Sequence, residues 1–429
     1  MGQWLILLFG CAFVCFAIGV PVGVSLGLGI LVLIAVNPIT SITYVAQQLY
    51  SGLDSLPILA IPCFMLSGAV MQVGGISKRL IRAANSLIGN FYGGLGLVTI
   101  VACLFFGAIS GSASATVVAI GSIMIPEMVK GGYPKIYATG LIAVAGGLGS
   151  IIPPSIPMII YGTSTSSSIG DMFLAGFFPG ILIGIFLGVI NWLLSKKNGY
   201  ISKGNKFSIR NTASAIWDAK FALAMPIIIL GGIYGGIFTP TEAAIVSVVY
   251  GIIVSLFIHK EIKIKELIKL TDSNTTFVGG IMMTFAPAAA LGGVFSLLQV
   301  QKGLTDLVAS INPSQFIVLL IVNVILLIIG MLLDSTSAIV IFAPLIVAIL
   351  KPFNMSPIHI GIIMIVNLCV GYVTPPMALN LFVASGLTKQ RMDQIAKAAI
   401  PFALFMIMAL LLITYIPQIS LGIFTLFGR

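Results

Sequence analysis

Residues 330–337, GMLLDSTS, place the carboxylate of Asp334 inside a hydrophobic run, Phe316 to Leu350, that has no other charged residue. Hydroxyl residues follow the acid directly, and residues 107–114, GAISGSAS, resemble this stretch without its acid. Charged residues make up only 7% of the chain, so an acid in this run needs a physical explanation.

The composition indicates a membrane protein. Hydrophobic residues account for 59% of the chain, in many long apolar runs, and a bilayer requires about 20 apolar residues per spanning helix. Backbone groups must also be satisfied within each span. We therefore expect an all-α polytopic membrane protein. The net charge of +10 then reflects loop charges that set orientation, and we expect no nucleic-acid partner.

The hydropathy pattern predicts a trace that starts on the inner side of the membrane. Residues 1–36 contain no Lys or Arg, which argues against a cleavable signal and for a first span. Amphipathic stretches are expected at 76–90 and 259–270. The predicted spans are 4–35, 55–74, 134–166, 172–195, 221–238, 241–258, 275–300, 357–388 and 398–426.

Two further segments, 93–129 and 315–350, return to the side on which they start. Each is short for two full spans and a turn, and each has a polar cluster near its middle. We expect re-entrant hairpins of two half-length helices whose polar tips meet inside the protein. Tight pairs of full-length helices are the alternative.

The positive charges agree with this trace. Eighteen Lys and Arg residues fall on the predicted inner side and three, Lys302, Lys351 and Arg429, on the outer side, as the positive-inside rule requires. The inner cations are Lys78, Arg79, Arg82, Lys130, Lys135, Lys196, Lys197, Lys203, Lys206, Arg210, Lys220, Lys260, Lys263, Lys265, Lys269, Lys389, Arg391 and Lys397.

The two halves of the chain match at an offset of 222 residues. This offset pairs Gly149 with Gly371, Pro153-Pro154 with Pro375-Pro376, Asp171 with Asp393, Pro179 with Pro401, Ser112 with Asp334 and Ser114 with Thr336. In the trace the first hairpin opens inward and the second outward. The pattern predicts an inverted repeat with a binding site at the bilayer midplane.

Four helix breaks are expected to converge at that site: 110–114, 151–155, 334–337 and 373–376. A half-helix that begins after each break presents unpaired N–H groups and the positive end of its dipole, which favours an anion. Carbonyl and hydroxyl oxygens there suit Na⁺. Asp334 would then face a cation, a proton or a ligand donor, because a midplane carboxylate costs about 3 kcal/mol. Helix capping by Asp334 and close packing by Ser110, Ser112 and Ser114 are the alternatives.

The chain resembles the large membrane subunit of tripartite ATP-independent periplasmic (TRAP) transporters over nearly its full length. The resemblance is carried, in family order, by FFGAISGSASAT (105–116), GGLGSIIPPSIPMIIYG (146–162), FLAGFFPG (173–180), MSPIHIGIIMIVN (355–367) and VTPPMALNLFV (373–383). It implies an inverted-repeat elevator transporter similar to the divalent-anion/sodium symporters, with no enzyme activity and no cofactor besides Na⁺ as the coupling ion.

The same resemblance implies the site residues. The first sodium site would comprise Ser110, Gly111, Ser112, Gly149, Ile152 and Ser155, and the second Asp334, Ser335, Ser337, Gly371 and Thr374. The organic acid would contact Ser112, Ser114, Thr116, Pro154, Ser155, Asp334, Thr336, Pro376 and Asn380.

The expected function is sodium-coupled uptake of an organic acid, with sialic acid favoured and a C4-dicarboxylate or another carboxylate as the alternative. The implied partners are a small membrane subunit, a periplasmic binding protein and the lipid bilayer. The chain would lie in the bacterial inner membrane, with its N-terminus cytoplasmic and its C-terminus periplasmic. We expect scaffold segments at 1–92, 171–314 and 393–429, and the two halves of a moving domain at 93–170 and 315–392.

Three other functions compete with this one. A channel would favour a continuous polar pore, whereas the polar residues here gather at isolated breaks. An intramembrane hydrolase would need a base near Ser110, and the two histidines, His259 and His359, lie away from the midplane in the trace. A proton-coupled carrier is a nearer alternative, because Asp334 could carry a proton.

Overall fold

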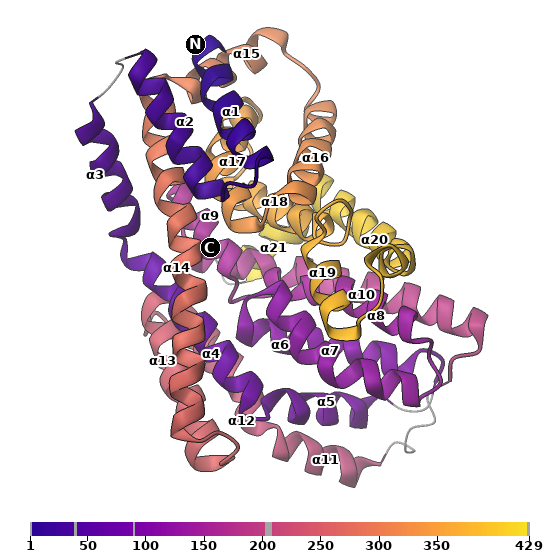
Figure 1. Cartoon of the computed structure of the whole chain (residues 1–429). Helices are drawn as coiled ribbons and strands as arrows, with labels where there is room; N and C mark the ends of the chain where they lie inside the picture. Colours follow the sequence, from indigo (N-terminus) through magenta and orange to yellow (C-terminus); the bar gives the residue numbers. More distant parts are fainter. Residues whose placement is uncertain (1, 38–40, 89–90, 202–207, 427–429) are drawn as a thin grey trace.

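The computed structural model describes residues 2–37, 41–88, 91–201 and 208–426, and this part of the chain is built from helices (Figure 1). Eight of the described helices are long and apolar enough to cross a bilayer. A ninth span results if the bent pair α11 (Ile209–Asp218) and α12 (Lys220–Tyr234) counts as one. The predicted class, an all-α polytopic membrane protein, is confirmed.

The repeat extends over nearly the whole chain at the predicted offset. The first copy contains α1 (Gly2–Ala17), α2 (Val22–Val36), α3 (Ile42–Leu53), the 3-10 turn Leu56–Leu59, α4 (Ala60–Val73), α5 (Ile76–Leu87), α6 (Gly94–Ser110), α7 (Ala113–Lys130), α8 (Lys135–Ala145), the 3-10 turn Gly146–Ser150, α9 (Ile156–Thr165) and α10 (Ile169–Asn198). The second contains α12, α13 (Pro240–Ile253, continued to Ile258), α14 (Ile264–Leu297), α15 (Val300–Ile311), α16 (Gln315–Leu332), α17 (Ser335–Leu350), α18 (Pro357–Gly371), α19 (Leu379–Thr388) and α20 (Met392–Tyr415).

The two hairpins, α6–α7 and α16–α17, open toward opposite ends of the molecule and bring their tips to its middle (Figure 1). This confirms the predicted inverted repeat. The four helices have 16 to 18 residues each, which is longer than the predicted half-length helices. Their re-entrant character comes from the tips, where Ser110, Ala113 and Ser337 are buried inside the protein.

Segments that carry the predicted inner cations meet at one end of the molecule. Arg79 of α5 pairs with Asp218 of α11 (3.6 Å) and with Glu261 after α13 (2.7 Å). At the same end Lys135 donates to the Thr388 carbonyl (2.8 Å). At the opposite end α15, which carries Lys302, packs on α17. Lys203, Lys206 and Arg429 lie outside the described residues.

The predicted single span over residues 4–35 is wrong. The chain turns at Gly19, which has a φ of +90°, and Pro21, and α1 and α2 pack side by side as a hairpin. Trp4 consequently lies beside Lys302 and Asp306, at the end opposite the cation-rich one. An N-terminus on the inner side is therefore incompatible with Lys302 on the outer side.

Two other predicted boundaries also change. The stretch 259–270 is not a separate helix, because α14 begins at Ile264 and continues unbroken for 34 residues. The last predicted span ends early, since α20 stops at Tyr415 before Pro417 and α21 (Gln418–Leu426) follows. The Tyr415 hydroxyl donates to the Phe316 carbonyl (3.1 Å), so α20 ends at the mouth of the second hairpin.

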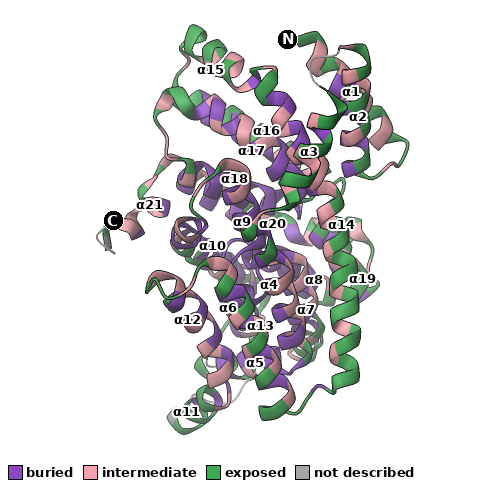
Figure 2. Ribbon diagram, turned by 90° about the vertical axis from the view of Figure 1, so that its left-hand side faces the viewer, coloured by how far each residue is buried: buried purple, intermediate pink, exposed green. Residues whose placement is uncertain are grey.

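The helices pack as two groups. α14 packs against α2, α3 and α4, and α4 packs against α13. The hairpins and broken helices pack with α10 and α20, around Tyr161 and Phe173, two of the largest fully buried side chains. Figure 2 shows much of α14 exposed and the buried residues gathered around α9, α10, α18 and α20. The predicted scaffold segments 171–314 and 393–429 therefore include two helices that pack with the hairpins.

Candidate functional site

Each hairpin turns at a residue that caps its second helix. The Ser112 hydroxyl accepts from the Ala115 N–H (3.4 Å) at the start of α7. At the equivalent position Asp334 accepts from the N–H groups of Thr336 (2.9 Å) and Ser337 (3.2 Å). Asp334 therefore caps its helix, as the alternative interpretation predicted. The residue is also exposed at the tip.

The same hydrogen bond ties both tips to the broken helices. The Ala113 N–H donates to the Ser150 hydroxyl (2.9 Å), and the Ser335 N–H donates to the Tyr372 hydroxyl (2.8 Å). These donors and acceptors are related by the 222-residue offset. Sequence reasoning missed Ser150 and Tyr372, although the repeat aligns them directly.

The broken helices start again beside the tips. Ser155 caps α9 and its hydroxyl donates to the Ser150 carbonyl (2.6 Å). The Ile156 N–H donates to the Gly111 carbonyl (3.1 Å) in the first half, and the Met377 N–H to the Met331 carbonyl (3.1 Å) in the second. At each break, one backbone N–H group is therefore satisfied by a carbonyl at the end of the neighbouring hairpin helix.

Glycines permit this close approach. A Cβ on Gly371 would collide with the backbone of Gly330, and one on Gly149 with the Thr116 hydroxyl and the Ser112 carbonyl. Overpacking of this kind costs about 1–3 kcal/mol. The glycine pair that the offset matched is thus a packing requirement of each tip.

The helix ends at the four predicted breaks converge on one cavity of about 520 Å³. The first residues of α7, α9, α17 and α19 line it, so four helix N-termini face a single space. α4 and α14 close the remaining side. The lining residues are Met65, Gly111, Ser112, Ala113, Ser114, Ser150, Ile156, Pro157, Thr276, Phe277, Gly280, Ile281, Thr284, Asp334, Ser335, Thr336, Tyr372 and Leu379.

Some predicted site residues line the cavity and others lie behind it. Those that line it are Gly111, Ser112, Ser114, Asp334, Ser335 and Thr336. Ser110 and Thr116 bond to each other through their hydroxyls (3.1 Å), and the Ser337 hydroxyl donates to Asp334 (2.5 Å). Both pairs support the tips from behind. Gly149, Ser155 and Gly371 do the same through the contacts described above.

The remaining predicted residues lie away from the cavity lining. The Ile152 side chain packs toward Gly180 of α10, and the Pro154 carbonyl lies behind Gly111. The Thr374 hydroxyl donates to the Val370 carbonyl (2.9 Å). Asn380 is buried and donates to the Ala143 carbonyl (3.0 Å). Pro376 is exposed in the segment between α18 and α19. Their binding roles remain predictions.

The cavity wall formed by α14 was not predicted. Thr276, Gly280 and Thr284 are spaced by four residues and line the cavity with Phe277 and Ile281. Such spacing places small and hydroxyl residues on one face of a helix. The spacing of Thr276, Gly280 and Thr284 within an apolar span was the sequence signal that could have predicted that α14 lines the cavity.

Asp334 is the one charged residue among the described residues that line the cavity. The helix N-termini contribute partial positive charge, which favours an anion. The carboxylate of Asp334 would repel that anion. The cavity therefore combines four anion-attracting ends with a single group that attracts cations.

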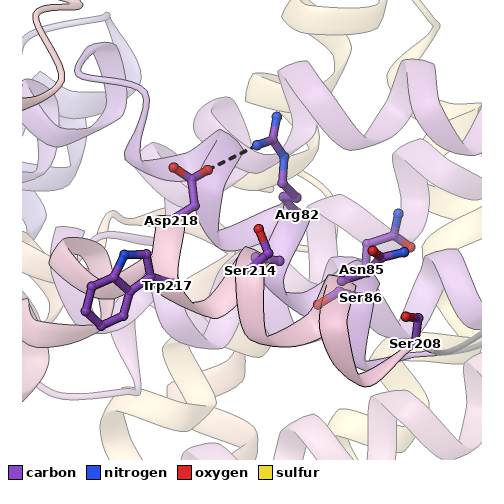
Figure 3. A pocket seen from close by; sticks show the side chains of 9 residues that line it. Arg82, Asn85, Ser86, Ser208, Ser214, Trp217 and Asp218 are labelled. Carbon is purple, nitrogen blue, oxygen red and sulfur yellow. Dashed lines mark hydrogen bonds and ion pairs between the residues drawn. The ribbon is translucent and has the colours of Figure 1, made fainter.

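A larger hollow of about 640 Å³ lies at the cation-rich end, between α5 and α11 (Figure 3). Figure 3 shows Arg82 reaching across to Asp218 (3.1 Å), while Trp217 points away from this pair. No predicted site residue lines it. We assign this hollow to the contact between two amphipathic helices and not to the site.

The histidines do not form a catalytic pair with Ser110. His359 is buried at the start of α18, where its ring nitrogens contact the Ser420 hydroxyl (3.1 Å) and the Thr414 carbonyl (3.3 Å). His259 contacts the Gly74 carbonyl (3.1 Å) at the cation-rich end. The Ser110 hydroxyl meets Thr116, so the hydrolase alternative has no nucleophile–base pair here.

Several curated relatives are similar to nearly all of this chain. The C4-dicarboxylate TRAP transporter large permease DctM of Rhodobacter capsulatus is 35% identical and covers 99% of both chains. The sialic acid large permease SiaM of Vibrio cholerae is 34% identical over 96% of both. The isethionate permease DctMQ of Oleidesulfovibrio alaskensis is 39% identical over 96% of this chain, which spans 65% of that longer protein.

Two solved transporters share the fold. YdaH of Alcanivorax borkumensis superposes with a TM-score of 0.65, covering 89% of both chains at 16% identity. MtrF of Neisseria gonorrhoeae gives a TM-score of 0.60 at 12% identity, covering 87% of this chain and 82% of its own.

A family model settles the classification. The model for the DctM component of the tripartite ATP-independent periplasmic transporter matches residues 9–419. Together with the relatives, it identifies a transport permease and not an enzyme. The chain is a multi-pass inner-membrane protein and belongs to the DctM family of TRAP transporter large permeases.

Proposed function

We propose that this permease takes up a small organic anion together with Na⁺, and that both bind in the central cavity. The observation that carries the proposal is the pairing of four helix N-termini with Asp334 in one cavity. The N-termini favour the anion. A cation beside Asp334 would offset the repulsion between its carboxylate and the anion.

Sodium fits the donor set at the tips better than a proton does. The Ser112 and Ser114 hydroxyl oxygens lie 3.3 Å apart at the first tip, and Asp334 and Ser335 line the cavity at the second. Hard cations prefer such oxygen ligands. Asp334 adds two oxygens, which contact the Thr336 N–H (2.9 Å) and the Ser337 hydroxyl (2.5 Å). A proton-coupled carrier is the second candidate.

The movement we propose separates the two packed groups of helices. The hairpins, broken helices, α10 and α20 would move as one body past α14, α4 and their neighbours. The cavity lies between these groups, with the tips on one side and α14 on the other. A shift of the moving body would therefore carry the bound anion and Na⁺ away from the α14 wall.

We place the cation-rich end in the cytoplasm, following the positive-inside rule. Both Trp4 and the end of α20 then lie toward the periplasm, which reverses the predicted side of the N-terminus. A periplasmic binding protein would dock at that face and a small membrane subunit on the α14 side. Maleimide labelling from outside should reach Asn312→Cys and not Lys260→Cys in a cysteine-free background.

The decisive experiment is uptake into proteoliposomes that contain this chain, its small subunit and the binding protein. An imposed sodium gradient should drive accumulation, and choline in place of sodium at fixed pH should abolish it. If accumulation persisted in choline and followed a pH gradient, the coupling ion would be the proton and not sodium.

The same assay identifies the anion. The names of the relatives include C4-dicarboxylate, isethionate and sialic acid, all organic anions. Labelled examples of all three should be tested in parallel. Sialic acid, which the sequence favoured, is one candidate, and failure of every anion in the panel would contradict the proposed substrate class.

A further inference from the structure

An apolar groove of about 500 Å³ lies between the α1–α2 hairpin and the second re-entrant hairpin. One wall is a face of α1 from Ile6 to Phe16, with Val22, Ser25 and Leu26 of α2. The other wall is Leu333, which precedes Asp334, together with Ile341 and Phe342 of α17. The groove thus reaches from α1 to the residue next to the cavity carboxylate.

The chemistry of the groove excludes water. Its lining has a single side-chain hydroxyl, Ser25, which donates to the Val20 carbonyl (3.2 Å) and is thereby satisfied. A cavity needs several polar partners to hold water. On the α1 side, Ile6 and Phe13 are 74% and 68% exposed, so the groove opens to the hydrocarbon around the protein.

The dimensions fit one hydrocarbon chain. The α1 wall from Ile6 to Phe16 extends about 15 Å at 1.5 Å per residue. One leaflet of the bilayer core is also about 15 Å thick. An acyl chain that follows this wall therefore spans the groove from the level of Ile6 to that of Phe16.

We propose that this groove binds one acyl chain of a membrane phospholipid. The acyl chain would link the re-entrant hairpin α16–α17 to the α1–α2 hairpin. The two walls belong to different packed groups. The Phe9 ring contacts Phe295 of α14 (5.9 Å), whereas Ile341 and Phe342 are part of α17. The acyl chain therefore occupies the boundary across which movement is proposed.

Two glycines provide a matched test. A Cβ on Gly10 or on Gly27 would meet no atom within 4 Å, so both sites tolerate a side chain. Gly10 lines the groove and Gly27 of α2 does not. Gly10→Trp fills the groove, and Gly27→Trp adds the same indole to the same hairpin elsewhere. Gly10→Leu is a smaller obstruction for use if the indole impairs folding.

The full-length protein is reconstituted with phosphatidylcholine that carries a diazirine halfway along one acyl chain, and is then irradiated. Mass spectrometry should locate the label on α1 and α17 in the parent and in Gly27→Trp. Labelling should fall about tenfold in Gly10→Trp, as expected when a site is blocked by more than 1.4 kcal/mol. Equal labelling in all three proteins would overturn the site. The site would also be overturned if adding the small subunit prevented the labelling and a cysteine at position 10 (Gly10→Cys) formed a disulfide with that subunit.

Uptake tests the second half of the proposal, which rests on the proposed movement. A tethered indole cannot leave the groove as a lipid can, so Gly10→Trp should lower the maximal uptake rate and leave KM unchanged. An unaltered maximal uptake rate would show that the acyl chain binds without linking the α1–α2 hairpin to α16–α17. Groove labelling with no sodium-driven uptake in the parent would instead contradict the proposed function.

Discussion

The two hairpin tips have the same backbone plan and different chemistry. Ser112 and Asp334 cap equivalent helices, and Ala113 and Ser335 donate equivalent hydrogen bonds to Ser150 and Tyr372. The first tip is neutral and rich in serine. The second carries the carboxylate that faces the cavity. The two tips therefore share one geometry, and only the second tip carries a charge.

This difference assigns different tasks to the tips. Under the proposed function, the neutral tip with its two helix N-termini would attract the anion, and the acidic tip would need a cation beside it before the anion could enter. Binding of the proposed anion and binding of the proposed cation would then depend on each other. Four pairs of substitutions test how far the tips are equivalent, from the largest expected effect to the smallest.

Replacing the matched glycines should have the largest effect on stability. Gly371→Ala forces a Cβ into the Gly330 backbone and should cost about 3 kcal/mol. Gly149→Ala should cost less, because its Cβ meets the Thr116 side chain and one backbone atom, the Ser112 carbonyl oxygen, whereas that of Gly371 meets only the Gly330 backbone. Thermal unfolding in detergent measures both. Gly386→Ala, with open space around it, is the control. Equal losses at both sites would show that the tips are packed alike.

Removing the charge at the second tip should weaken coupling to sodium. Asp334→Asn retains a capping side chain, because Asn caps about as well as Asp. The lost attraction exceeds about 1 kcal/mol at contact distance, so the sodium concentration for half-maximal uptake should rise about fivefold or more. Ser112→Asn, the equivalent change at the neutral tip, should shift it far less. An unchanged sodium dependence in Asp334→Asn would contradict the proposed cation site.

Removing the two tying hydroxyls should give unequal losses. Ser150→Ala leaves the N–H of Ala113, a buried residue, without its partner and should cost about 1–3 kcal/mol. Tyr372→Phe frees the N–H of Ser335, which is only half-buried, so water can replace the hydroxyl at a cost of about 1 kcal/mol or less. Unfolding and amide exchange at Ala113 and Ser335 measure the effects. Ser122→Ala, on an exposed face of α7, is the neutral control.

Replacing the cap of the first tip with another neutral cap should have the smallest effect. Ser112→Asn should change the free energy of unfolding by less than about 0.5 kcal/mol, because Ser and Asn are comparable neutral caps, and Ser112→Ala should cost about 1 kcal/mol. Chemical denaturation compares the two. A large loss for Ser112→Asn would mean that the first tip has no room for a larger cap, which would sharpen the contrast between the tips.

Much of this architecture could be predicted because it leaves strong marks on the sequence. The hydrophobic runs, the one-sided cations and the paired glycines and prolines specified the hairpins, the breaks and their convergence. Asp334 was conspicuous because charge is rare in such a span. These features depend on local composition, which is visible without coordinates.

Other features depend on packing between distant segments and were missed. The turn at Gly19 and Pro21 interrupts a run that is as apolar as a full span, so hydropathy alone joined α1 to α2. The packing of α10 and α20 with the hairpins depends on which faces of these helices meet, and the sequence does not show this. The α14 wall could not be placed at the cavity without knowing which side of the tips it covers.

The unbroken helix α14 has a consequence for stiffness. Its counterpart in the first repeat is interrupted between Asp54 and Leu59, a register that corresponds to residues 276–281 of α14. Two adjacent glycines, Gly279 and Gly280, occur there, each costing a helix about 1 kcal/mol relative to alanine. These glycines lower the resistance of α14 to bending beside the central cavity, so the two repeats contain a continuous and an interrupted form of the same helix.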